Sequence, residues 1–294
     1  MRGCQATGWR YVCCDGPVTE NDTDPVVLRS VAEGLASEAA EFVRRRRVEV
    51  FGAAHATAAV VRTKSTPTDP VTVVDTETER LLRDRLAELR PGEHILGEEE
   101  GGSIGGRDGL TWVLDPIDGT VNFLYGIGSY AVSVGVQRDG ASLAGAVANV
   151  DTGALYSAAL GHGARVQRAG VTTALEASAA VELSMSLVGT GFSYSAEKRT
   201  LQAEILAKML PAVRDVRRMG SAALDLCMVA AGQLDAYYED GVHVWDWAAG
   251  ALIAAEAGAN LLLPQADGEA GLIVAAAPGI ADALADALGR SGGL

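Results

Sequence analysis

The 294-residue sequence is poor in cysteine, aromatic residues and basic residues, and it has no long apolar run. Three of its four cysteines, Cys4, Cys13 and Cys14, lie near the N-terminus and have neither the spacing of a metal site nor that of a disulfide framework. Cys227 lies in a helical apolar pattern, so we interpret it as a small core residue. The sequence gives no sign of cysteine chemistry.

Membrane and nucleic-acid functions are disfavoured by composition. No apolar stretch approaches the roughly 20 residues that a membrane-spanning helix needs, and the N-terminus lacks the apolar centre of a signal peptide. We therefore expect a cytoplasmic protein with no membrane partner. Lysine and arginine number 24 against 38 acidic residues, a formal net charge of −14. This charge argues against binding to nucleic-acid phosphates, and an anionic substrate would need bound cations in order to dock.

The apolar content of 48% is sufficient for a sizeable core. Residues 1–23 show no periodicity, and we expect a disordered tail, although an early start codon would give the same pattern. Residues 24–180 contain helices followed by hairpin-like strands and turns, whereas residues 181–294 alternate between strands and helices. We therefore predict an α/β protein with an N-terminal α+β half, a C-terminal α/β half and an active-site cleft between them.

Helix and turn signals locate the main elements. Asp24-Pro25 is typical of a helix start, and the first helix is predicted to end at residues 44–47. A strand over residues 71–74 is predicted to lead into a second helix, with Thr76 and Glu79 as its capping box. Further strands are predicted at residues 94–96, 110–114, 130–137, 144–150, 183–188, 234–238, 260–263 and 271–275, and helices at residues 196–209, 222–231, 245–258 and 280–288.

The most informative stretch is Asp115-Pro116-Ile117-Asp118-Gly119-Thr120, which follows the predicted strand 110–114. Two carboxylates thus leave a strand end in a tight turn, where proline restricts the backbone and glycine permits unusual angles. Glu98 follows the preceding short strand, so the acids would converge if the two strands lie side by side. Asp246 lies at a helix entrance, and Asp75 at a strand-to-helix junction.

Each of these acids could alone be a helix cap or part of a solvated loop, and on spacing alone a cap is the first interpretation of Asp75. Together they would repel, because two unit charges about 4 Å apart interact by roughly 4 kcal/mol at an effective dielectric constant near 20. Such a cluster either takes up protons or binds cations. Oxygen ligands without nearby His or Cys favour a hard ion, and with an anionic substrate they favour Mg²⁺.

Clustered Mg²⁺ ions on an acidic protein favour a phosphate substrate. Metal ions catalyse phosphate-ester hydrolysis by activating water and neutralising the leaving oxygen. No Cys or His stands in a nucleophile context, so direct attack by water is favoured over a phospho-enzyme. Thr120 could pass a proton from that water towards Asp75.

Three ordered motifs, Gly97-Glu98-Glu99, Asp115–Thr120 and Trp245-Asp246-Trp247-Ala248-Ala249-Gly250, resemble those of the inositol monophosphatase family, most closely its bacterial, actinobacterial type. The resemblance covers about residues 28–288. It implies an α-β-α-β-α sandwich and Mg²⁺-dependent, lithium-sensitive phosphatase activity. It also implies a homodimer.

The resemblance also implies roles for individual residues. Two or three Mg²⁺ ions would be bound per site. Glu98, Asp115 and the Ile117 carbonyl would hold the first ion, and Asp115, Asp118 and Asp246 the second, with Glu98 and water around a third. The remaining implied roles are catalysis for Glu98, Thr120 and Asp75, phosphate binding for Gly119 and Thr120, substrate binding for Asp118, Ala222, Glu239 and Asp246, and a loop near the site for residues 64–69.

We therefore expect a phosphomonoesterase that hydrolyses myo-inositol 1-phosphate to myo-inositol and phosphate. One alternative keeps the chemistry but changes the substrate to histidinol phosphate, fructose 1,6-bisphosphate or a 3′-phosphoadenosine compound. Another is a regulatory role in which the protein binds a partner, although the sequence offers little support for it.

Overall fold

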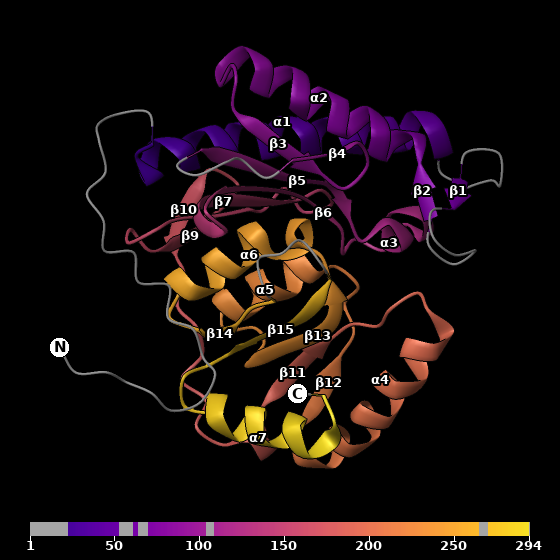
Figure 1. Cartoon of the computed structure of the whole chain (residues 1–294), viewed down its shortest axis with the longest axis vertical. Coiled ribbons are helices and arrows are strands. Elements are labelled where there is room, and N and C mark those ends of the chain that lie inside the picture. The colour runs from indigo at the N-terminus through magenta and orange to yellow at the C-terminus, as the bar shows by residue number, and fades with distance from the viewer. Residues whose placement is uncertain (1–22, 53–60, 64–69, 104–108, 265–269, 294) are drawn as a thin grey trace.

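The computed structural model describes residues 23–52, 61–63, 70–103, 109–264 and 270–293. Its elements form five layers, with helices outside, an eight-stranded sheet, a central helix layer, a five-stranded sheet and a second outer helix layer (Figure 1). The predicted α-β-α-β-α sandwich is therefore confirmed. The expected tail and the loop at residues 64–69 lie outside the described residues, except for Thr23.

The first outer layer consists of α1 (Pro25–Phe51) and α2 (Val73–Leu89). Asp24 caps α1 as predicted, since its carboxylate accepts the Val26 N–H at 2.8 Å. The predicted end of α1 at residues 44–47 is wrong, because the helix continues to Phe51. Phe51 is buried and packs edge-on against Phe123, which anchors the last turn of the helix.

The start of α2 also differs from the prediction. The strand β2 (Pro70–Thr72) ends earlier than expected, and α2 begins at Val73. Thr72 is the N-cap and Asp75 completes the capping box, so the predicted box of Thr76 and Glu79 is wrong. The actual box is Thr-x-x-Asp, in which a shorter acid replaces the usual Glu or Gln.

The eight-stranded sheet has the order β10-β9-β8-β7-β6-β5-β3-β4. From β5 to β10 it is an antiparallel meander, as predicted. The strands β3 and β5 are parallel neighbours, with Gly97 opposite Leu114, which confirms that these two strands lie side by side. The strands are β3 (His94–Gly97), β4 (Gly101–Gly102), β5 (Leu110–Asp118), β6 (Ala131–Arg138), β7 (Ala141–Asn149), β8 (Leu155–Ala159), β9 (Ala164–Arg168) and β10 (Val171–Ala174).

The five-stranded sheet has the order β12-β11-β13-β15-β14 and is covered on its outer side by α4 and α7 (Figure 1). The strand predicted at residues 183–188 is only partly correct, because its first residues form a 3₁₀ turn, η1 (Leu183–Met185). The other predicted elements overlap the observed ones, with ends displaced by a few residues. The elements are β11 (Leu187–Thr190), β12 (Asp215–Arg217), β13 (Ala236–Val242), β14 (Asn260–Leu262), β15 (Gly271–Ala276), α4 (Ala196–Met209), α7 (Ala281–Ser291) and the 3₁₀ turn η2 (Leu210–Ala212).

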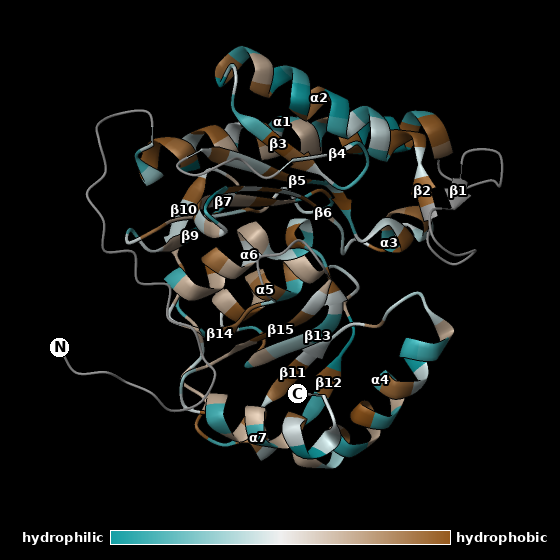
Figure 2. Ribbon diagram, viewed as in Figure 1, coloured by the Kyte–Doolittle hydropathy of each residue, from teal (hydrophilic) through white to brown (hydrophobic). Residues whose placement is uncertain are grey.

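The central layer consists of α5 (Ala222–Ala230) and α6 (Val244–Glu256), which are apolar on most sides (Figure 2). That composition suits helices buried between two sheets. One apolar cluster joins them to residues of both sheets, including Val147 and Tyr237. The division into halves at residues 24–180 and 181–294 stays a prediction. Each sheet lies within one of these ranges, although α5 and α6 pack on both sheets.

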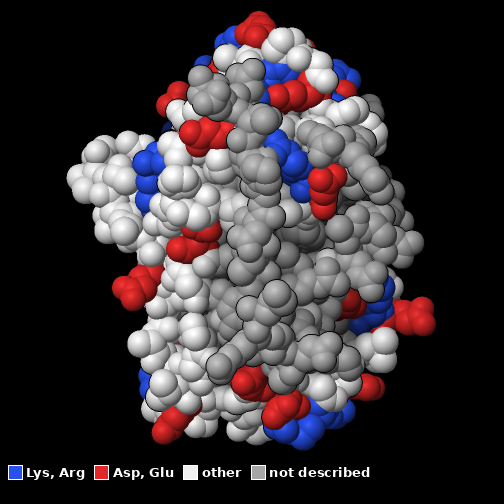
Figure 3. All heavy atoms as spheres, turned by 60° about the vertical axis from the view of Figure 1, so that its left-hand side comes forward, with Lys and Arg blue, Asp and Glu red and all other residues white. Residues whose placement is uncertain are grey.

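Among the described residues, no helix is both long enough and apolar enough to cross a membrane. On the face shown in Figure 3, the acidic and basic side chains of the described residues are interspersed rather than separated by sign. Arg85, for example, forms ion pairs with Glu38 and Glu88, and Arg46 with Glu49 and Glu77. Each of the four arginines at residues 44–47 of α1 has a partner within the chain: Arg44 donates to the Val150 carbonyl, Arg45 and Arg46 pair with Glu49, and Arg47 donates to the Phe123 carbonyl.

Two glycines allow α6 to lie directly against the eight-stranded sheet. A Cβ atom added at Gly145 on β7 would lie 2.7 Å from the Cα atom of Ala249, and one added at Gly135 on β6 would lie 2.9 Å from the Cβ atom of Ala248. Neither separation occurs between real atoms of this kind. The small residues of α6 and the glycines of the sheet therefore set the position of the helix that carries Asp246.

We predict that Gly145→Ala lowers the free energy of unfolding by about 1–3 kcal/mol, because the added methyl group overpacks this contact. The matched control is Gly34→Ala on the exposed side of α1, where nothing lies within 4 Å. It should raise stability by about 0.5–1 kcal/mol through helix propensity. Urea unfolding of the three proteins measures both effects, and equal shifts for the two variants would contradict the close-packing interpretation.

Candidate active site

A pocket of about 540 Å³ collects nearly all of the residues nominated from the sequence. Only Asp75 is absent from its lining, and it lies directly behind the lining residue Thr120. The strand β5, the central helices α5 and α6, and β13 all contribute. The nominated residues that line the pocket are Glu98, Asp115, Ile117, Asp118, Gly119, Thr120, Ala222, Glu239 and Asp246.

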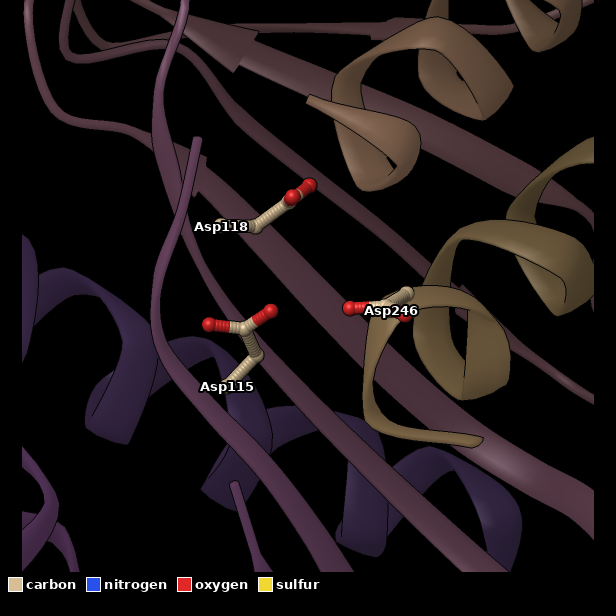
Figure 4. Close-up of side chains that lie close together, drawn as sticks. All are labelled: Asp115, Asp118 and Asp246. Atoms are coloured by element: carbon tan, nitrogen blue, oxygen red, sulfur yellow. The ribbon is translucent and has the colours of Figure 1, made fainter. Parts of the chain in front are cut away.

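Three aspartates converge in this pocket. Asp115 and Asp118 leave the end of β5, and Asp246 approaches them from the first turn of α6 (Figure 4). One carboxylate oxygen from each of the three lies within 4.8 Å of the others. The pairing of β5 with β6 is irregular between Asp115 and Asp118, where Pro116 offers no N–H.

Hydrogen bonds hold two of the aspartates, Asp118 from a distant part of the chain and Asp246 from its own helix start. The hydroxyl of Ser221 and the N–H of Ala223, both at the start of α5, donate to Asp118 Oδ2 at 2.6 and 2.7 Å. The His243 N–H donates to Asp246 Oδ2 at 2.6 Å, so Asp246 is the third residue of α6 rather than its N-cap. These bonds fix one oxygen of each carboxylate.

The electrostatics of this group favour protons or cations. Burial raises the pKa of Asp118 to about 6, although the hydrogen bonds from Ser221 and Ala223 oppose the rise. Burial, and then the charges of Asp118 and Glu98, raise the pKa of Asp246 well above its usual value. The residues present fit a hard divalent cation, because carboxylates crowded into a buried pocket supply both the oxygen ligands and the negative charge that such an ion requires.

Glu98 reaches the pocket through a loop that Glu79 holds in place. The Glu98 N–H donates to the Leu114 carbonyl of β5 at 3.2 Å. The buried carboxylate of Glu79 accepts the N–H groups of Glu99 and Glu100 at 2.7 and 3.0 Å and pairs with an arginine of its own helix. Glu79 is therefore an anchor for the loop that follows β3, a role that local sequence signals did not reveal.

Asp75 contacts the pocket through Thr120. Its Oδ1 lies 3.2 Å from the Thr120 hydroxyl, and its Oδ2 accepts the Thr72 N–H at 2.9 Å and the Thr72 hydroxyl. The Thr120 hydroxyl is also 3.1 Å from the Ile117 carbonyl, and it has one proton to donate to either acceptor. Asp75 is thus a helix cap and a neighbour of Thr120 at once.

Gly119 and Thr120 form the start of the short helix α3 (Thr120–Tyr125). Gly119 has a φ of 95°, and a Cβ atom there would lie 2.9 Å from the Ser129 carbonyl oxygen and 3.0 Å from that of Gly220. Only glycine fits this position. The first N–H groups of a helix have no acceptor within that helix, and this helix start lines the pocket.

Comparison with known proteins identifies the family to which this chain belongs. The model of the inositol monophosphatase family matches residues 24–291. The chain belongs to this family. It is a phosphatase, and the resemblance inferred from the three motifs is confirmed, including its actinobacterial type.

Mycobacterial members of the family cover almost the whole chain. The chain is 65% identical over 286 residues to the inositol-1-monophosphatase of Mycobacterium leprae, with 94% of this chain and 98% of that protein covered. It is 62% identical over 285 residues to the inositol-1-monophosphatase SuhB of Mycobacterium tuberculosis, with the same coverage. The solved structure of Mycobacterium tuberculosis SuhB aligns with a TM-score of 0.80 at 60% identity, covering 93% of this chain and all of that one.

The rest of the pocket lining is mixed in character. Ala222 and Glu239 line the pocket as nominated, and Ser193 lines it too. His243 and Trp245 stack with ring centroids 4.7 Å apart and form part of the wall. Sequence reasoning gave no pocket role to Lys198, Arg218 or Trp245, although Arg218 lies four residues before the nominated Ala222 and Trp245 opens a quoted motif.

We predict that without metal the acid cluster destabilises the protein as pH rises. The unfolded state releases the proton of residue 118 near pH 3.8, whereas the folded state holds it to about pH 6. Stability is therefore lost over this interval. In EDTA, wild-type protein should lose stability relative to Asp118→Asn as pH rises from 4 to 7, as measured by urea unfolding.

Added Mg²⁺ should reverse this difference, because a cation stabilises the ionised carboxylates. At 100 times its dissociation constant an ion that binds only the folded state adds about 2.7 kcal/mol. If wild type is more stable than Asp118→Asn by an amount that changes with neither pH nor Mg²⁺, the cation-binding interpretation is contradicted.

Proposed function

We propose that this phosphatase hydrolyses myo-inositol 1-phosphate to myo-inositol and phosphate and requires Mg²⁺. The observation that carries the proposal is the convergence of Asp115, Asp118 and Asp246 in one pocket with a helix start and Glu239. Two mycobacterial relatives with above 60% identity are named inositol-1-monophosphatases, which supports this substrate over other small phosphates.

The proposed metal ligands are those that the family resemblance implies, and the proximity of Asp115, Asp118 and Asp246 supports them. Glu98, Asp115 and the Ile117 carbonyl would hold one Mg²⁺, and Asp115, Asp118 and Asp246 a second, with Glu98 beside a third. Mg²⁺ supplies positive charge for the phosphate oxygens and for the leaving alkoxide, and it makes water more acidic. Mg²⁺ is preferred because it binds through few carboxylates together with substrate phosphates, whereas Ca²⁺ takes more protein oxygens.

The chain's own groups would bind the phosphate and orient the attacking water. The N–H groups of Gly119 and Thr120, at the start of α3, would bind the phosphate, because the first N–H groups of a helix have no acceptor within it. When the Thr120 hydroxyl donates to Asp75, its lone pairs can accept a hydrogen bond from water. Glu98, which also lines the pocket, would accept a proton from the same water. These three side chains are the proposed catalytic residues.

The proposed contacts to the polyol are Asp118, Ala222, Glu239 and Asp246. Carboxylates accept hydrogen bonds from hydroxyl groups, so an alcohol with several hydroxyls would bind better than one with none. From the family we further infer inhibition by Li⁺, a homodimer and a cytoplasmic location.

Phosphate release from myo-inositol 1-phosphate, with Mg²⁺ and with EDTA, tests the proposal. We expect activity only with Mg²⁺, and a loss of at least ~100-fold in kcat/KM for Asp115→Asn, the order that loss of one preorganised electrostatic contact costs. The control is Asp139→Asn, in the hairpin turn between β6 and β7, which should leave activity unchanged. Equal rates with Mg²⁺ and with EDTA would reject the requirement for Mg²⁺. Faster turnover of histidinol phosphate, fructose 1,6-bisphosphate or a 3′-phosphoadenosine compound would reject the proposed substrate.

We also predict that Thr120→Val lowers kcat by about 10²–10⁴-fold, the range for loss of a positioned proton-transfer group, with little change in KM. Asp75→Asn should lower kcat in wild type but add little in the Thr120→Val background, because both residues act on the same water. Steady-state kinetics of the single and double variants measure this coupling. Independent, multiplicative losses would show that Asp75 acts only as a helix cap.

A further inference from the structure

Glu239, which lines the pocket, is held in place by a side chain that is not itself part of the lining. Tyr237 is fully buried, and its hydroxyl donates to Glu239 Oε2 at 2.6 Å. The two residues alternate along β13 with Tyr238 between them, so they share one face of the five-stranded sheet. Glu239 lines the pocket, whereas Tyr237 does not. Tyr237 therefore acts on the pocket through Glu239.

Two glycines of the neighbouring strand make room for this pair. In the parallel pairing of β11 and β13, Gly189 lies opposite Tyr237, and Gly191 follows immediately after β11. A Cβ atom at Gly189 would lie 3.3 Å from the Tyr237 ring and 2.8 Å from Leu234, and one at Gly191 would overlap the Glu239 carboxylate. The phenol ring and the carboxylate thus occupy the space that side chains at positions 189 and 191 would otherwise fill.

The hydrogen bond also opposes protonation of Glu239. Burial raises the pKa of Glu239, whereas the bond from Tyr237 and the charge of Arg218 lower it. Because the Tyr237 hydroxyl binds one carboxylate oxygen, it restricts the direction in which the other oxygen can face. An ionised, fixed carboxylate accepts hydrogen bonds from substrate hydroxyls without first losing conformational freedom.

We propose that Tyr237 and Gly191 are positioning residues that fix Glu239 for recognition of polyol hydroxyls, and that they thereby give selectivity for polyol phosphates over phosphates of alcohols without neighbouring hydroxyls. The inference rests on the proposed function. The selectivity would then depend on the buried phenol of Tyr237 and on the absence of a side chain at Gly191, rather than on the aspartates proposed to bind metal.

The test compares myo-inositol 1-phosphate with 4-nitrophenyl phosphate, which has no polyol hydroxyls. Tyr237→Phe removes only the donor, and Gly191→Ala displaces the carboxylate. Each variant should lower kcat/KM for the inositol phosphate about tenfold, mainly through KM, because one hydrogen bond to a charged group is lost. Each should change kcat/KM for the aryl phosphate less than twofold and leave the Mg²⁺ dependence unaltered.

Two controls separate positioning from general damage. Tyr238→Phe removes the neighbouring buried phenol, whose hydroxyl bonds with Thr190, and should leave the ratio of kcat/KM for the two substrates unchanged. Glu239→Gln sets the reference, and Tyr237→Phe should add no further loss in that background, because Tyr237 acts through Glu239.

The outcomes distinguish this inference from the proposed function. Wild-type protein that hydrolyses the aryl phosphate with Mg²⁺ but not the inositol phosphate would overturn the proposed substrate and the selectivity inference that rests on it. Wild-type activity on both substrates, with equal losses on both in Tyr237→Phe, would overturn the positioning role alone. If Tyr237→Phe lowers the unfolding temperature below the assay range, Gly191→Ala decides, and an unchanged ratio in that variant counts against the inference.

Discussion

The electrostatic repulsion among Asp115, Asp118 and Asp246 is the constraint on which the rest of the site depends. Three carboxylates with oxygens within 4.8 Å of one another cannot all be ionised in a buried pocket without counter-charge. The fold nonetheless holds them together, so the surrounding structure must offset the electrostatic repulsion between them. A cation both relieves this repulsion and serves as the docking point for an anionic substrate on a protein of net charge −14.

The surrounding structure maintains that proximity by using helix starts. Asp246 accepts a backbone N–H at the beginning of α6, and Asp118 accepts one from the first turn of α5. Asp75 does the same at the start of α2 while its other oxygen lies beside Thr120. The interpretation of these acids as caps and their interpretation as site residues are therefore compatible, because a carboxylate has two oxygens.

The five-layer arrangement brings these helix starts to one place. The helices α5 and α6 lie between the two sheets, and the glycines of β6 and β7 allow α6 to approach closely. Since β5 ends beside the first turn of α6, acids more than 120 residues apart in the sequence meet in Figure 4. Tyr237 donates a hydrogen bond to Glu239, and Gly191 leaves free the space that the Glu239 carboxylate occupies. The glycines of β6 and β7 and Gly191 thus help to determine where the carboxylates of Asp246 and Glu239 lie.

The sequence by itself determined the residue types, the layered α/β fold and the acidic part of the pocket lining, because acids at predicted strand and helix ends are brought together wherever those ends meet. It did not determine how the acids are held. Only the tertiary structure decided that Ser221 donates to Asp118, 103 residues away, that Glu79 anchors the loop of Glu98, and that Tyr237 bonds to Glu239. Local patterns report propensities of neighbouring residues, whereas these bonds depend on the register of strands and the packing of helices, which no local pattern contains.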